Sequence, residues 1–176
     1  MKNKRIKDLV LMGVCLAIIV VCSKISIPIG TIPLTLQTFA LFVCSLILGI
    51  KAFFVFLLYI LLGLIGLPVF SSGGGFSYIY MPSFGFVIGF LPSSAIIGLA
   101  SKSEKKYLKY VLSFVGLLVL NIFGVVYMYF ILNLYMDAST SLLYVLQVAV
   151  LPFIIKDIII MVLSCIIYSR IKVIIN

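Results

Sequence analysis

The sequence predicts an all-α integral membrane protein with six transmembrane helices. Its 176 residues are 65% hydrophobic and 10% charged, and the mean hydropathy is +1.40. This composition leaves too little polar surface to coat a soluble domain. The apolar residues gather in runs close to the roughly 20 residues that cross a bilayer. Lysine and arginine fall in short clusters between these runs, where such residues orient a membrane protein.

The first span follows a basic start and is expected to be retained. Four basic residues open the chain: Lys2, Lys4, Arg5 and Lys7. A basic start before an apolar run is also typical of a secretory signal peptide, but this run continues to Ile27 without an A-x-A-like cleavage site. We therefore predict a transmembrane helix near residues 9–27.

Five further spans follow with short connections. Apolar runs separated by charge, proline or glycine place them near 36–50, 52–67, 83–100, 110–134 and 153–172. Residues 142–150 are apolar but short, and Pro152 interrupts the sequence after them, so we expect a partial helix there. No internal repeat is visible, so nothing supports a transporter built from two equal inverted halves. Residues 1–176 are predicted to form a single membrane domain.

The positions of the basic residues orient the six helices. Eleven lysine and arginine residues fall at the chain ends and in the second and fourth connections, whereas only Lys24 falls in the opposite connections. Short basic connections stay in the cytoplasm, so both termini are predicted to be cytoplasmic. The same distribution explains the net charge of +9 without nucleic acid as a partner.

The chain offers no evident metal site or catalytic group set. It contains no histidine, and its four cysteines lie in apolar runs without C-x-x-C spacing. They are predicted to be small core residues rather than metal ligands or disulfides. An enzyme needs an acid–base or nucleophilic set. We therefore expect neither an enzyme nor a bound cofactor.

Two outward connections have unusual composition. Residues 27–38 carry two prolines and no charge, and residues 67–82, here called the outer loop, combine three consecutive glycines with aromatic and hydroxyl side chains. Irregular backbone near lipid persists only where protein or a ligand-lined cavity satisfies its polar groups. Both connections are therefore predicted to fold over the outer mouth of the bundle.

Asp157 is the acidic residue that membrane burial makes most costly. It lies a few residues inside the last apolar run with Lys156 beside it. Ionisable groups at this depth are paired or line a polar cavity. A mutual ion pair is one interpretation, but adjacent residues diverge by about 100° on a helix, which disfavours it. A ligand-binding role for Asp157 is the preferred interpretation.

The glycines of the outer loop allow close approach of a ligand to the main chain. Gly74 is the central one, and Ser77 and Tyr78 follow with hydrogen-bonding groups. The alternative is a flexible outward loop whose aromatic residues anchor it at the membrane interface. The phosphate-binding lysine of a nucleotide loop is absent from this segment.

Small residues four apart allow close helix approach. Gly13 and Ala17 form such a pair in the first span, and Gly85 and Gly89 form another in the fourth. Each pair fits either a partner surface or internal packing.

Four segments, in order, resemble the BioY family, the biotin-binding S components of energy-coupling-factor transporters. Residues 33–38 read P-L-T-L-Q-T and residues 62–70 read L-G-L-I-G-L-P-V-F. The glycines of the outer loop lead to Pro82 and the Gly85 region, and Pro152 precedes Asp157. The resemblance covers about residues 5–170 without a large insertion.

The resemblance implies a six-helix bundle in a prokaryotic cell membrane that captures biotin from outside. It further implies partners, namely a membrane T component and ATPase subunits. By resemblance, Asp157 hydrogen-bonds the ureido end of biotin. Ser77 occupies the position of the family's polar residue after the glycines. Gly13 and Ala17 correspond to the small-residue motif of the first helix that docks on the T component. The expected substrate-binding residues are Asp157, Lys156, Ser77, Tyr78, Gly74, Gln37 and Thr35.

The chain departs from the family at one charged position. The family commonly has a lysine three residues after the acid, where this chain has Ile160. Lys156 lies one helical turn before Ile160 on nearly the same face, so it could reach the biotin carboxylate instead. Alternatives to biotin capture are an S component for another vitamin and a non-transport membrane subunit.

Overall fold

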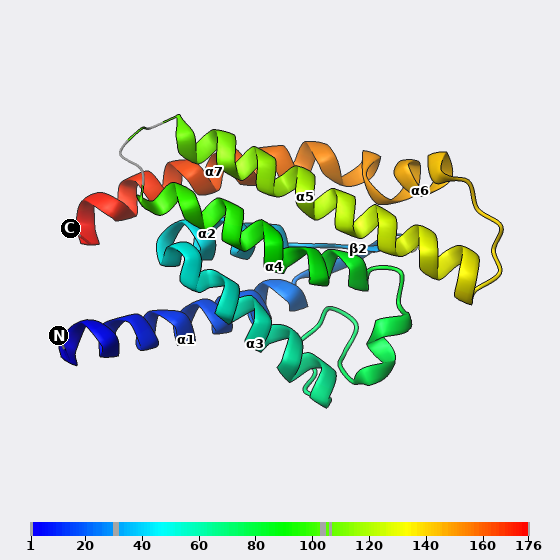
Figure 1. The fold of residues 1–176 in the computed structure, drawn as a ribbon, viewed down its shortest axis with the longest axis horizontal. Helices are drawn as coiled ribbons and strands as arrows, with labels where there is room; N and C mark the ends of the chain where they lie inside the picture. Colours follow the sequence, from blue (N-terminus) through cyan, green and yellow to red (C-terminus); the bar gives the residue numbers. More distant parts are fainter. Residues whose placement is uncertain (1, 30–31, 103–104, 106, 176) are drawn as a thin grey trace.

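The computed structural model describes residues 2–29, 32–102, 105 and 107–175. Seven α-helices dominate these residues (Figure 1). They are α1 (Lys2–Lys24), α2 (Gln37–Leu48), α3 (Ala52–Ile65), α4 (Phe84–Leu99), α5 (Leu108–Phe130), α6 (Leu142–Ala149) and α7 (Leu151–Ile175). Short helical turns are η1 (Gly49–Lys51), η2 (Phe76–Tyr80), η3 (Ala100–Lys102) and η4 (Ile131–Tyr135). The predicted helical class is confirmed.

Helices α1 to α5 and α7 overlap the six predicted spans along the chain, and their crossing of the membrane stays a prediction. Four stretches of the described residues are long and apolar enough to cross a membrane, namely Arg5–Lys24, Gln37–Ile65, Leu108–Tyr135 and Leu151–Ile171. The second stretch holds both α2 and α3, which the turn η1 joins, and α4 is apolar but only 16 residues long. The partial helix expected at residues 142–150 is α6, which ends just before α7 begins.

The connection between α1 and α2 is a short hairpin. Strands β1 (Ser26–Ile29) and β2 (Ile32–Thr35) pair antiparallel, with Ser26 opposite Thr35 and Pro28 opposite Pro33. Helix α2 has 12 residues, so it is about 18 Å long and shorter than the roughly 30 Å hydrocarbon core. The paired strands satisfy backbone groups that would otherwise lie unbonded beside the bundle mouth.

Helix α2 lies at the centre of the packing. It contacts α1, α4 and α7, and most of its residues are buried, including Leu41 and Phe42. All four cysteines are buried and free, as predicted for small core residues. The beginning of α1 and the end of α7 lie at the same end of the molecule (Figure 1). The positions of the basic residues predict that this end faces the cytoplasm, and this orientation stays a prediction.

Helix α3 ends where the sequence changes to glycine and proline. Gly66 adopts a φ of 118°, and the backbone N–H of Leu67 bonds the carbonyl of Leu62 at 3.1 Å. A left-handed glycine with this bond is the usual helix-ending motif. One turn earlier, Gly63 lies directly beneath the buried ring of Phe70, and a Cβ there would sit 2.0 Å from its Cζ. The absence of a side chain at Gly63 therefore lets the outer loop pack on α3.

Gly63→Ala is expected to destabilise the protein by about 1–3 kcal/mol, because the added methyl group overpacks the site and must displace the Phe70 ring. Thermal unfolding of the purified protein in detergent measures the effect. Gly13→Ala is the matched control, since a Cβ at Gly13 meets nothing within 4 Å. Equal unfolding temperatures for the two variants would show that the outer loop does not pack as described.

Candidate functional site

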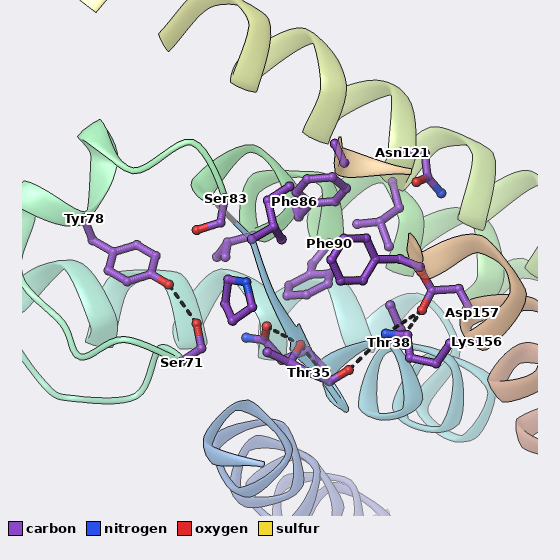
Figure 2. A pocket seen from close by; sticks show the side chains of 17 residues that line it. Thr35, Thr38, Ser71, Tyr78, Ser83, Phe86, Phe90, Asn121, Lys156 and Asp157 are labelled. Carbon is purple, nitrogen blue, oxygen red and sulfur yellow. Dashed lines mark hydrogen bonds and ion pairs between the residues drawn. The ribbon is translucent and has the colours of Figure 1, made fainter. Parts of the chain in front are cut away.

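A pocket lies between the hairpin, the outer loop and helices α4, α5 and α7 (Figure 2). Its empty volume is about 590 Å³, part of which is open to solvent. The part of this space that is open to water-sized molecules is about 60 Å³. Occupied small-molecule sites are about 300–1,000 Å³, so a ligand would have to widen this pocket. The lining residues are Ile32, Pro33, Thr35, Gln37, Thr38, Ser71, Tyr78, Ser83, Phe86, Val87, Phe90, Leu120, Asn121, Ala149, Phe153, Lys156 and Asp157.

One end of the pocket holds a charged cluster that joins α7 to the start of α2. Lys156 Nζ lies 2.8 Å from Asp157 Oδ1, and the hydroxyl of Thr38 donates to the same oxygen at 2.9 Å. The expectation that adjacent positions disfavour a mutual pair is therefore wrong. The long, flexible lysine stem reaches around the helix, so the angle between the two Cα–Cβ directions does not limit the pair.

The hydrogen-bonding capacity of Lys156 is fully used in this arrangement. An ammonium group has three N–H donors. Besides Asp157, Lys156 Nζ lies 3.0 Å from the carbonyl oxygen of Thr35 and 3.4 Å from the hydroxyl of Thr38. Among the described residues, both polar contacts of the Asp157 carboxylate fall on Oδ1. The second oxygen, Oδ2, is therefore left to accept hydrogen bonds from a ligand.

The other end of the pocket carries hydroxyl groups. Ser71 and Tyr78 of the outer loop share a hydrogen bond of 3.0 Å, and Ser83 precedes α4 (Figure 2). The Tyr78 ring is buried against Phe70, with ring centroids 4.4 Å apart. Because three hydroxyls share one mutual bond, donors remain that can reach a ligand.

Apolar walls connect the two polar ends. Phe86 and Phe90 lie between them, and the amide of Asn121 on α5 lies nearer the charged end (Figure 2). Leu120 also lines the pocket. Asn121 Nδ2 donates to the carbonyl of Leu117 on its own helix at 2.8 Å. Its Oδ1 is an additional acceptor at the pocket. A mostly apolar pocket with a few placed polar groups is the usual form of a small-molecule site.

The structure brings together five of the seven substrate-binding candidates. Thr35, Gln37, Tyr78, Lys156 and Asp157 line the pocket. The two others are outside its lining: Ser77 is exposed on η2, and Gly74 lies against the carbonyl of Leu67, where a Cβ would sit 2.1 Å from the oxygen. Gly74 therefore serves close packing of the outer loop on itself.

Sequence reasoning missed Ser71, Ser83, Asn121 and Thr38 as pocket residues. Asn121 carries a sequence signal, since it is an amide in the middle of an apolar run. The three hydroxyl residues carry no comparable signal, because serine and threonine are common in membrane helices and loops.

The family model for the BioY family matches residues 1–176. The chain belongs to the BioY family. Among its relatives, the "Biotin transporter BioY" of Thermotoga maritima is 34% identical over 94% of this chain and 96% of that protein. The "Probable biotin transporter BioY" of Lysinibacillus sphaericus is 31% identical over 97% of this chain and 89% of that protein.

A solved structure agrees with the BioY assignment in fold. It is the crystal structure of the S-component for biotin from an ECF-type ABC transporter, with a TM-score of 0.85 and 24% identity over 98% of this chain and 94% of that one. As a BioY protein with several long apolar helices, the chain is a multi-pass protein of the cell membrane and not an enzyme, as predicted.

Proposed function

We propose that this protein is the substrate-capture subunit of a vitamin uptake transporter and that its ligand is biotin. The observation that carries the proposal is the pocket with a buried carboxylate, Asp157, at one end, hydroxyl groups at the other and aromatic walls between them. Biotin has a polar ureido ring at one end, an apolar chain in the middle and a carboxylate at the other end. Its chemistry therefore matches the pocket, with the ureido ring at Asp157, the chain along the aromatic walls and the carboxylate at the hydroxyl groups.

In the proposed binding mode, Asp157 Oδ2 accepts a hydrogen bond from one ureido N–H group. A hydrogen bond to an ionised carboxylate is about twice as strong as one between neutral groups. The aromatic rings of Phe86 and Phe90 cover the ring system and the chain of the ligand. The backbone carbonyl of Thr35, at the end of the hairpin, accepts a hydrogen bond from Lys156 and so helps to hold the Lys156 side chain in place.

Transport energy is proposed to come from partner subunits, a membrane T component and ATPases. The sequence offers no nucleotide-binding motif and no chain of intramembrane acids for proton coupling. The proposed docking surface is the face of α1 around Gly13 and Ala17. Both residues are exposed, and the space beside Gly13 is open. Small exposed residues permit a partner helix to approach closely.

Titration of the purified protein against biotin and other vitamins tests the ligand. We expect saturable binding of biotin and none of comparable affinity for chemically different vitamins such as thiamin or riboflavin. Tight binding of another vitamin with weak or absent biotin binding would favour the alternative, an S component with a different ligand.

Lys156→Ala is expected to weaken binding of biotin and of a neutral biotin amide by similar factors, roughly ten-fold, because Lys156 holds Asp157 at the end of the pocket proposed for the ureido ring. All three donors of Lys156 are in use within this cluster. Calorimetric titration of both ligands measures the two losses.

Lys51→Ala is the control for Lys156→Ala, since Lys51 pairs with Asp8 away from the pocket. A clearly larger loss for biotin than for the amide would place the biotin carboxylate at Lys156 and overturn the proposed orientation of the ligand.

A further inference from the structure

Three side chains outside the pocket lining hold the first part of the outer loop. Ser23 Oγ at the end of α1 lies 2.5 Å from the carbonyl oxygen of Val69 and 2.7 Å from that of Val20, so its one proton is shared between them. The Tyr59 hydroxyl of α3 donates to the Val69 oxygen at 3.1 Å. Lys24 Nζ donates to the next carbonyl, that of Phe70, at 2.6 Å. Two adjacent backbone carbonyls thus receive three side-chain donors from two helices.

These bonds fix the point where the outer loop enters the bundle. Phe70 is fully buried, and its ring packs edge-on against Tyr59, with centroids 5.4 Å apart, and against the ring of Tyr78. Ser71 follows directly and bonds Tyr78, and both side chains line the pocket. The position of the Val69 and Phe70 carbonyls therefore decides where the hydroxyl end of the pocket lies.

The same network reaches the opposite wall of the pocket through Gln37. Its Oε1 accepts from the hydroxyl of Thr35 at 3.0 Å, and its Nε2 donates to the Tyr59 hydroxyl at 2.8 Å. Tyr59 in turn donates to Val69. Both ends of the Gln37 amide are hydrogen-bonded to these neighbours, so Gln37 connects the hairpin to the outer loop through Tyr59. Buried hydrogen bonds linked in this way strengthen one another.

We infer that Ser23, Lys24 and Tyr59 form a latch that keeps the outer loop closed over the pocket and so slows ligand release. The inference rests on the proposed function. It assigns a positioning role to three residues that do not line the pocket. Within a set of related variants, affinity differences appear mainly in the dissociation rate. A latch of this kind should therefore change koff far more than kon.

Lys24 is the most informative residue of the latch. It is exposed, so its replacement leaves the core packing intact, and an ammonium donor gives a stronger hydrogen bond than a neutral one. Lys24→Met retains the side-chain length without the donors. Tyr59→Phe removes only the buried hydroxyl, and Ser23→Ala removes the second donor to Val69.

The first measurement is the release of labelled biotin from the full-length protein in nanodiscs after addition of excess unlabelled biotin. Lys24→Met and Tyr59→Phe are each expected to raise koff about ten-fold, with kon changed by less than about three-fold. Lys24→Arg should restore the slow release because guanidinium also donates to the carbonyl. Lys51→Met, at a lysine paired with Asp8 on a different surface, should leave koff unchanged.

The second measurement needs no ligand. Hydrogen–deuterium exchange of the unliganded protein should become faster in residues 67–78 of Lys24→Met and Tyr59→Phe, with α4 and α5 unchanged. Unchanged exchange in both variants would overturn the latch, and so would faster exchange without faster release when the parent protein binds biotin. If the parent protein itself binds no biotin, the proposed function fails, and faster exchange in the variants would still support the role of these contacts in holding the outer loop, so the two failures are distinguishable.

Discussion

Asp157→Asn is expected to weaken biotin binding by roughly ten- to a hundred-fold. The substitution removes a charge-assisted hydrogen bond of about 1.5–3 kcal/mol while keeping the size of the side chain. It also leaves Lys156 without its ion-pair partner at 2.8 Å, so the geometry of the charged cluster changes with the charge. Isothermal titration of purified variant and parent protein with biotin measures the loss.

The control for Asp157→Asn is Asp137→Asn, which makes the same chemical change at an exposed residue that does not line the pocket. Monodisperse gel filtration and an unchanged helical circular dichroism spectrum establish that both variants fold. Parent-like biotin affinity in a folded Asp157→Asn protein would remove this carboxylate from the site.

Gly13→Leu, and likewise Ala17→Leu, is expected to abolish ATP-driven biotin uptake while leaving biotin binding intact. A bulky side chain on this face would separate helices that must approach closely. The space beside Gly13 is open within the chain, so the leucine should not disturb folding. Uptake by vesicles that contain the complete transporter measures the loss, and titration of the isolated protein measures binding.

Val14→Leu is the control for the α1 surface, because Val14 is also exposed but points about 100° away from Gly13. Normal uptake by both Gly13→Leu and Ala17→Leu in the complete transporter would show that this face is not the docking surface. Loss of biotin binding in the isolated variants would instead place these residues in the internal packing.

The sequence predicted the helices because hydrophobic length is a local property. Each of the six spans has its counterpart among α1 to α5 and α7, and the proline- and glycine-rich connections became the hairpin and the outer loop. It also identified Asp157, because a carboxylate inside an apolar run is costly wherever the helix lies in the bundle. The hairpin itself was not predicted, because its pairing with two opposed prolines follows from the placement of α1 and α2.

The pairing of side chains was decided by the tertiary structure alone. Lys156 and Thr38 both bond the same oxygen of Asp157 because α7 packs on the start of α2. Thr38 and Asp157 are more than a hundred positions apart in the chain. Ser77 was expected at the ligand and is exposed, whereas Ser71, six residues earlier, lines the pocket. The sequence thus determined the membrane helices and the charged residue that burial makes costly. Which hydroxyls and amides meet that residue was set by packing, because a hydrogen bond depends on distances of a few ångströms between distant segments.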